Sequence, residues 1–284
     1  MAPSLSSLRT ALLTAGALGA SIFALAAAAE TTRIVLLNGR SIPLGAVAHQ
    51  GENLVIITAT ETFNEGQTIP FEQADHVYGE EPPELKQATA LLLMDKPKDA
   101  QKLLEPIVSH HRITASIPGN FWLEAARTLL VACAVARDTL KCTELGKEIS
   151  DATPAPGNDP FVALGKALLL PTSAKVEDRD IALADLTTDA RMPADVSAYA
   201  SFYRANLLKQ EKHPDQALEA YLTVPCLFPS GGLVLMAAAE IQAAELLNDP
   251  PRRAEALALL RSAARNAGDT VLLEEANKRL KSLQ

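Results

Sequence analysis

The stretch Ala198–Ser230, AYASFYRANLLKQEKHPDQALEAYLTVPCLFPS, decides the fold expected for this chain. It reads as two helical segments separated by a polar break. Ala205 and Ala217 lie twelve residues apart, one in each segment, and such small side chains let two antiparallel helices approach closely. Tyr221 follows one turn after the second alanine, and Pro229 closes the pattern because proline cannot continue a helix. The stretch therefore predicts a helical hairpin.

The same pattern recurs in weaker form elsewhere in the chain. Ala88 and Ala100 are again twelve residues apart, and a third copy follows residues 249–251. Two copies enter their second helix through a proline, Pro97 in one and Pro214 in the other, where the missing N–H costs no hydrogen bond. Because the small and apolar residues have the same spacing in each copy, we expect an array of helical hairpins. An irregular helical bundle is the alternative.

The positions of the small residues, the aromatic residue and the closing proline resemble those of the tetratricopeptide repeat (TPR). This sequence departs from that family's pattern at Ser201 and Leu208, where bulky aromatic residues are commoner. The resemblance implies a TPR-like α-α helical-repeat solenoid. In such a solenoid the first helix of each pair lines a concave groove, and the groove takes an extended or helical protein segment.

The resemblance also implies which residues line the groove. In the best copy and in the next first helix they are Tyr199, Phe202, Asn206, Lys209, Met236 and Glu240. Asn206 and Lys209 resemble part of the carboxylate-binding arrangement of peptide-binding TPR proteins, although the first copy lacks the matching residues. The alternative is that Tyr199 and Phe202 pack on a neighbouring helix.

Composition limits the class of protein. Of the 284 residues, 48% are hydrophobic but only 4% are aromatic, so the apolar mass is mainly alanine and leucine, which favours helices. The net charge is −8, and the basic residues are dispersed along the chain. Nucleic-acid-binding proteins carry a basic stripe, so we expect no nucleic-acid partner.

Residues 1–29 have the pattern of a signal peptide. Arg9 precedes the weakly hydrophobic run Thr10–Ala26, and the small residues 27–29 provide a cleavage site near Ala29. The pattern is bacterial in style and predicts a periplasmic or secreted protein without stable membrane insertion. An uncleaved membrane anchor is the alternative, because the apolar run approaches the length that spans a bilayer.

Residues 30–79 predict a small β-module. Arg33–Leu37 and Ser41–His49 flank Asn38-Gly39, a strong hairpin signal, and Leu54–Thr58 is rich in β-branched residues. Thr68–Phe71, a one-turn helix and a short strand complete the pattern. We expect five strands in an all-β roll or SH3-like barrel that docks or caps rather than catalyses.

Residues 80–284 predict a TPR-like α-helical repeat domain. Two prolines at 82 and 83 mark its start, because they cannot continue a strand. Eleven helices are expected, the last one amphipathic with a charged outer face that includes Glu275 and Arg279. Their predicted ranges are Glu84–Asp95, Pro97–Ser109, Asn120–Arg137, Thr139–Ser150, Pro160–Leu170, Glu177–Ala190, Ala194–Gln210, Pro214–Val224, Leu233–Leu247, Pro251–Asn266 and Thr270–Leu283.

Catalytic and metal-binding patterns are not found in the sequence. Its five histidines are scattered. The adjacent His110 and His111 would point about 100° apart on a helix and so cannot both face one metal. No HExxH, paired CxxC, GxSxG or phosphate-binding glycine loop occurs. We therefore expect no enzyme, no cofactor and no metal.

The three cysteines suggest one covalent hypothesis. Cys133 and Cys142 lie on either side of a turn predicted at residues 137–138, so a disulfide is possible in an oxidising compartment. Two buried, unbonded cysteines at a tight helix crossing are the alternative. Cys226 has no evident partner and is expected to be buried.

These observations favour a non-catalytic scaffold or adaptor of the bacterial cell envelope, which binds a protein partner whose identity the sequence does not reveal. Two alternatives remain. One is a structural, homo-oligomeric or membrane-anchored envelope protein, and the other is an envelope enzyme with an unrecognised site.

Overall fold

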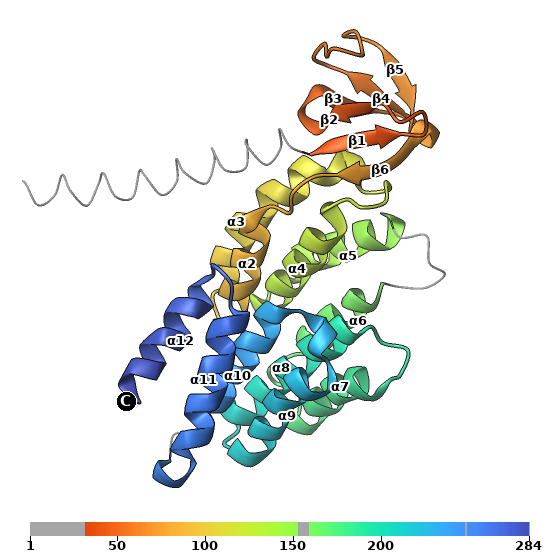
Figure 1. The fold of residues 1–284 in the computed structure, drawn as a ribbon. Helices are drawn as coiled ribbons and strands as arrows, with labels where there is room; N and C mark the ends of the chain where they lie inside the picture. The colour runs from red at the N-terminus through yellow and green to blue at the C-terminus, as the bar shows by residue number, and fades with distance from the viewer. Residues whose placement is uncertain (1–31, 153–158, 248, 284) are drawn as a thin grey trace, which may run out of the picture. The chain divides into compact units, whose positions relative to one another are not determined.

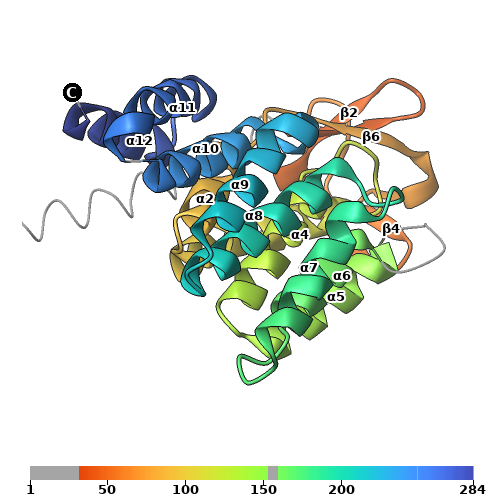
Figure 2. The ribbon, with the colours of Figure 1, turned by 90° about the horizontal axis from the view of Figure 1, so that it is seen from below.

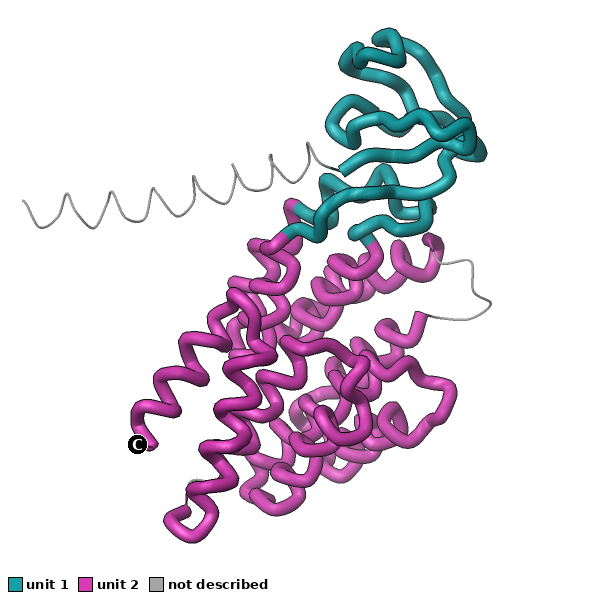
Figure 3. The backbone as a smooth tube through the Cα atoms, in the orientation of Figure 1, with its two compact units in different colours: residues 1–82, 107–122 teal, residues 83–106, 123–284 magenta. Residues whose placement is uncertain are grey.

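The computed structural model describes residues 32–152, 159–247 and 249–283. The predicted signal peptide, residues 1–29, lies outside them. The described chain is mainly α-helical, with a small β region before the helices (Figure 1). It divides into two compact units (Figure 3). The β unit comprises residues 32–82 and 107–122, and the helical unit comprises the remainder, so the β unit takes in a segment beyond the predicted module.

The β unit contains six short strands rather than five, in two three-stranded antiparallel sheets. The predicted strand Ser41–His49 is split by a one-turn 3-10 helix, because Pro43 sets a backbone that leads into a turn. The sheet orders are β2-β1-β6 and β3-β4-β5. The elements are β1 (Arg33–Leu36), β2 (Ser41–Pro43), η1 (Leu44–Ala46), β3 (Val47–Gln50), β4 (Asn53–Ile56), β5 (Thr68–Pro70), η2 (Phe71–Gln73) and β6 (Ala74–Tyr78).

The β unit is internally duplicated: residues 33–50 (β1, β2, η1 and β3) form the first copy, and residues 53–78 (β4, β5, η2 and β6) form the second. In its first hairpin Ile34 pairs with Ile42, and in its second Leu54 pairs with Ile69 in the same register. All four side chains are buried. Each hairpin then runs through a proline into a one-turn 3-10 helix and a third strand. That third strand pairs with the hairpin of the other copy: β3 with β4, and β6 with β1.

Backbone hydrogen bonds repeat between the two copies. Leu36 N–H donates to the Arg40 carbonyl in the first hairpin, as Ile56 N–H donates to that of Gln67 in the second. Gly39 and Gly66 occupy the same turn position, with φ of 78° and 80°. Both copies contribute buried side chains to the same core. The duplication therefore explains how so small a unit gathers twelve buried side chains into one cluster.

All eleven predicted helices are present, with each end within three residues of the predicted position. They are α2 (Pro83–Leu93), α3 (Pro97–His111), α4 (Trp122–Val135), α5 (Thr139–Ala152), α6 (Pro160–Leu168), α7 (Val176–Thr188), α8 (Ala194–Gln210), α9 (Pro214–Leu227), α10 (Leu233–Leu246), α11 (Arg253–Asn266) and α12 (Val271–Ser282). The hairpin expected from Ala198–Ser230 is α8–α9, whose Ala205 and Ala217 are completely buried.

Two helices of the helical unit each pack against four or more other helices. α8 packs against α6, α7, α9 and α10, and α10 packs against α2, α9, α11 and α12. In Figure 2, α10 lies between α9 on one side and α11 and α12 on the other. Alanines over much of α10 permit this crowding, because small side chains let helices approach on several faces.

The beginning and end of the helical unit meet. α2 packs against α10 and α12, although nearly two hundred residues separate α2 from α12 in the sequence. The Gln87 side-chain oxygen accepts a hydrogen bond from the backbone N–H of Val271, at 3.2 Å. This closure brings residues from both ends of the unit to one site.

Candidate binding pocket in the helical unit

A pocket of about 440 Å³ lies among five helices of the helical unit: α2, α8, α9, α10 and α12. Its lining is apolar in part, with Leu93, Ala238, Ile241 and Leu272. Polar side chains from α8, α10 and α12 line the rest. Pockets that combine an apolar lining with a few placed polar groups are the usual binding sites of proteins.

Helical periodicity positions the polar groups. Asn206 and Lys209 are three residues apart on α8, and Glu275 and Arg279 are four apart on α12, so each pair lies on one helix face. Glu275 and Arg279 had been expected on the charged outer face of the last helix. That expectation was wrong for these two residues, because both line the pocket and Arg279 donates a hydrogen bond to Glu245 of α10.

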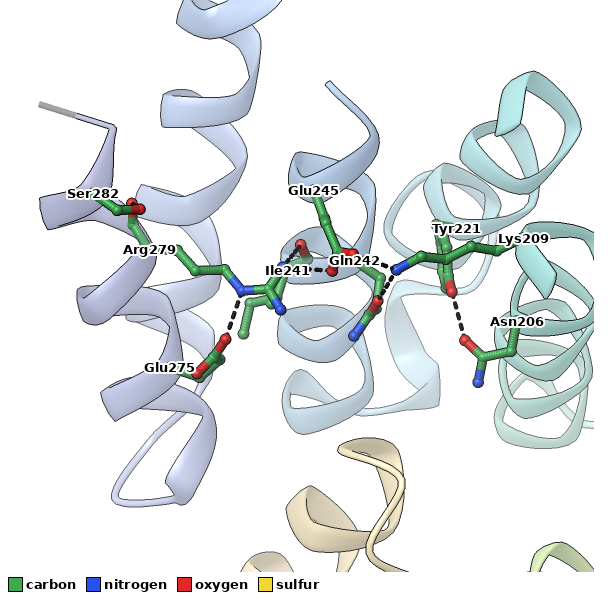
Figure 4. Close-up of polar contacts among 9 residues, drawn as sticks. All are labelled: Asn206, Lys209, Tyr221, Ile241, Gln242, Glu245, Glu275, Arg279 and Ser282. Atoms are coloured by element: carbon green, nitrogen blue, oxygen red, sulfur yellow. Dashed lines mark hydrogen bonds and ion pairs between the residues drawn. The ribbon is translucent and has the colours of Figure 1, made fainter. Parts of the chain in front are cut away.

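A network of charges joins three helices (Figure 4). The Lys209 ammonium donates to Gln242 Oε1 at 3.0 Å and to Glu245 Oε1 at 2.8 Å. Arg279 donates from Nη1 to Glu245 Oε2 at 2.8 Å and from Nε to Glu275 Oε1 at 2.6 Å. Glu245 on α10 therefore bridges α8 and α12 and fixes their spacing around the pocket.

Burial and charge act in opposite directions on this network. Burial alone would raise the pKa of Glu245, but hydrogen bonds and charge from Lys209 and Arg279 outweigh it, so the pKa lies below its ordinary value. Burial alone would lower the pKa of Arg279, but Glu275 and Glu245 raise it. Both shifts favour the charged forms of Glu245 and Arg279 at neutral pH.

Tyr221 on α9 supplies the aromatic wall of the pocket. Its ring is completely buried, and its hydroxyl donates to Asn206 Oδ1. Burial, and next the charge of Glu245, raises the pKa of Tyr221, so the hydroxyl stays protonated. This bond fixes the orientation of the Asn206 amide, so the amide NH₂ group points away from the Tyr221 hydroxyl.

Three side-chain donor groups at the pocket remain unpaired within the part of the chain that the structure describes. Asn206 Oδ1 is occupied by Tyr221 and Gln242 Oε1 by Lys209, which leaves both amide NH₂ groups without a partner among the described residues. Arg279 Nη2 is likewise unpaired there. Among the lining residues, the charges of Lys209 and Arg279 balance those of Asp95 and Glu275. In a lining with no net charge, these three unpaired donors suit uncharged acceptors, such as main-chain carbonyl groups.

The six residues expected to line a groove do not lie together. Asn206 and Lys209 line the pocket. Tyr199 and Phe202 are buried, at 6% and 1% exposure, and Tyr199 meets the Phe161 ring edge to face. Glu240 is also buried and accepts a hydrogen bond from Asn266 of α11, whereas Met236 is half-buried outside the pocket.

Sequence reasoning did not assign the remaining polar residues of the pocket. Tyr221 had been singled out for packing only, and Gln242 and Glu245 had not been singled out at all. A helical sequence shows which residues share a face, but not which distant helix that face meets. The spacing of Leu272, Glu275 and Arg279 on one face of the last helix was the only available signal.

The cysteines are free in the structure. Cys133 and Cys142 are buried, and burial raises the thiol pKa to about 12 for Cys133 and to about 11 for Cys142. The Cys142 thiol donates to the Leu130 carbonyl at 3.8 Å. Cys226 is exposed, so its expected burial was wrong; it lies near the end of α9, where the chain leaves the packed face.

The described residues contain no group of three or more histidine, cysteine, aspartate or glutamate side chains that could hold a metal ion. His110 and His111 stack edge to face, with ring centroids 5.1 Å apart. None of the helices among residues 32–152, 159–247 and 249–283 combines the length and apolar character needed to cross a bilayer.

Comparison with known proteins gives no match: no family model fits the sequence, and neither a curated protein nor a solved structure is significantly similar to the chain. Fold alone does not establish function, so a functional assignment depends on the chemistry of the pocket.

Proposed function

We propose that this chain is a non-catalytic protein-binding scaffold or adaptor of the bacterial envelope, exported by residues 1–29. Its helical unit holds an extended segment of a partner protein in the pocket between α2, α8, α9, α10 and α12. The observation that carries the proposal is the set of unpaired donors beside an apolar lining: Asn206 Nδ2, Gln242 Nε2 and Arg279 Nη2. Main-chain carbonyls of a bound segment supply the acceptors that these groups lack.

A TPR-like repeat origin of the helical unit is part of the proposal. Its support is the succession of helical hairpins and the buried alanine pair at the α8–α9 contact. In this reading the array closes on itself through α2, so the groove is filled by Tyr199 and Phe202 along α8. The pocket at Asn206 and Lys209 is the part of the groove that stays open. The β unit, proposed as an SH3-like roll, serves docking.

The test converts unpaired donors into acceptors without changing side-chain shape. Asn206→Asp keeps the oxygen that accepts from Tyr221, and Gln242→Glu keeps the oxygen that accepts from Lys209. The double variant N206D/Q242E should therefore fold normally but lose binding of a carbonyl-bearing segment by at least about tenfold, because two donors become repulsive acceptors.

Partner capture is measured by in-cell photo-cross-linking from a reactive residue placed at Gln210 on the pocket rim. The matched control N277D/Q73E makes the same two amide-to-acid changes at exposed positions outside the pocket. One recurrent cross-linked protein, lost in N206D/Q242E and kept in the control, supports the proposal. Equal capture by both variants contradicts it.

A structural homo-oligomer is the second candidate, and one observation favours it. Leu227 and Leu233 are exposed at 68% and 61%, and Leu227 borders a shallow apolar groove on α9 that also includes Cys226. Sedimentation over a range of concentrations separates the two candidates: an oligomer that dissociates on dilution, and that Leu227→Ser abolishes, supports the structural role.

A further inference from the structure

The third strands of the two copies, β3 and β6, differ in whether their outer edge is covered. On β6 the Val77 N–H donates to the Pro118 carbonyl at 2.8 Å. Gly119 lies so close that a Cβ atom there would be 2.7 Å from the Val77 carbonyl oxygen. Ile117, only 3% exposed, joins the core next to this contact. The segment Ile117-Pro118-Gly119 therefore covers the edge of β6.

The equivalent edge of β3 is open. His49 pairs with Leu54 as Val77 pairs with Ile34, so the internal duplication makes His49 the counterpart of Val77. Ile56 gives its N–H to the β5 side of β4, and alternate residues of a strand point the same way, so Leu54 does too. The backbone N–H and C=O of His49 therefore point away from the sheet. No described residue pairs with them, and His49 is exposed.

The side chains at the two edges differ in the same way. On the covered edge Val77 is 5% exposed, and Leu44 of η1 is 1% exposed. Their counterparts on the open edge are His49, which is exposed, and Phe71 of η2, which is only partly buried. The two rings meet edge to face with centroids 4.9 Å apart. An apolar surface and a free backbone donor thus lie together where the other copy holds Ile117 and Pro118.

We propose that the free edge of β3 binds an extended segment of a partner protein with the chemistry of residues 117–119, a branched apolar residue followed by Pro-Gly. The prolyl carbonyl of this segment accepts from the His49 N–H, and its apolar side chain packs on Phe71. Exposed strand edges are templates for such added strands. Proline has no N–H and ends the pairing after one residue, so the contact is short and binding is weak.

The probe is a fluorescent peptide with the sequence of residues 112–121, RITASIPGNF, titrated into the full chain and followed by anisotropy. His49→Pro removes the outward N–H without removing a hydrogen bond to β4, and proline is tolerated on an edge strand. His49→Ala keeps the N–H and is the matched control. We expect saturable binding to the native protein, a loss of about tenfold or more in H49P, and a loss of less than about threefold in H49A.

A second measurement leaves the protein unchanged and so does not depend on the folding of H49P. In a modified peptide a methylene group replaces the prolyl carbonyl, which deletes the acceptor, and this peptide should also bind about tenfold more weakly. N206D/Q242E should bind the native peptide normally. The proposal is overturned if the native protein shows no saturable binding, if the methylene peptide binds as well as the native one, or if N206D/Q242E abolishes binding.

Discussion

Two tyrosines of the helical unit differ in one hydrogen bond. Tyr203 on α8 and Tyr221 on α9 both pack against the Phe202 ring. The hydroxyl of Tyr221 donates to Asn206, whereas the buried hydroxyl of Tyr203 has no partner within the described ranges of the chain. A buried polar group without a hydrogen-bond partner lowers the free energy of unfolding, whereas a buried hydrogen bond raises it by about 1 kcal/mol.

The two conservative substitutions should therefore change stability in opposite directions. We expect Tyr203→Phe to raise the free energy of unfolding by about 1 kcal/mol, because it removes an unpaired hydroxyl, and Tyr221→Phe to lower it by about 1 kcal/mol. Urea denaturation of both variants measures the difference. A change of the same sign in both would contradict the hydrogen-bond assignment.

His111 makes the β unit sensitive to acid. Its side chain is 2% exposed, and burial, assisted by the neighbouring His110, lowers its pKa to about 4 from 6.5. The folded state therefore disfavours protonation of His111. The contribution of neutral His111 to the free energy of unfolding is fully present above pH 6.5 and is lost as the pH falls through about 4. The loss should reach about 3 kcal/mol, from 1.36 kcal/mol per unit of pKa shift. In His111→Phe, stability measured by urea unfolding between pH 6.5 and 4 should lose most of this slope; an unchanged slope argues against the assignment.

The free thiols can be counted. Burial and raised pKa values protect Cys133 and Cys142, so the native protein should react with a thiol reagent at Cys226 alone. After denaturation without reductant, three thiols should react. A count of one would instead show that the hypothesised Cys133–Cys142 disulfide forms.

At the scale of elements, the duplicated hairpins of the β unit explain how six strands of three to five residues stay folded. The third strand of each copy pairs with the hairpin of the other copy, so neither copy forms a three-stranded sheet by itself. Equivalent positions in the two hairpins should then respond alike to mutation.

Gly39 and Gly66 test this equivalence. Both have positive φ near 80°, and no atom lies within 4 Å of an added Cβ, so backbone strain alone opposes a side chain. Gly39→Ala and Gly66→Ala should each cost about 1 kcal/mol. Gly45→Ala, equally open but without positive φ, should cost little and serves as the control. Thermal unfolding measures all three, and clearly unequal costs at Gly39 and Gly66 would count against the duplication.

At the scale of the whole molecule, closure of the helical unit joins segments that are remote in sequence. α12 packs against α2, α10 and α11, whereas α7 packs against α6 and α8. The pocket therefore depends on the last helix, which supplies Leu272, Glu275 and Arg279.

Truncation after Asp269 should loosen α2 selectively. Loss of α12 removes the Gln87–Val271 hydrogen bond and the packing on α2, so amide hydrogen exchange should accelerate there. The amides of α7, which does not pack against α12, are the internal control. Equal acceleration in both helices would indicate general destabilisation instead.

The sequence by itself determined the succession of elements. Proline at helix starts, alanines twelve residues apart and Asn-Gly between β-branched runs are local signals, and they located all eleven helices and the first hairpin. Local signals also misled. Pro43 lies within one predicted strand, although in the structure it ends β2 and leads into a 3-10 turn. The matching Ile-Pro pairs at residues 42–43 and 69–70 are a sign of the duplication within the sequence.

Only the tertiary structure decided what the elements contact. The resemblance to the TPR pattern indicated Asn206 and Lys209 as site residues, and it gave no indication of Gln242, Glu245 or Arg279. Their meeting depends on the closure of α2 onto α10 and α12, and periodicity within a helix carries no information about which distant helix it will touch. Likewise, the open edge of β3 follows from which strand pairs with which, since backbone hydrogen bonds do not depend on side-chain identity.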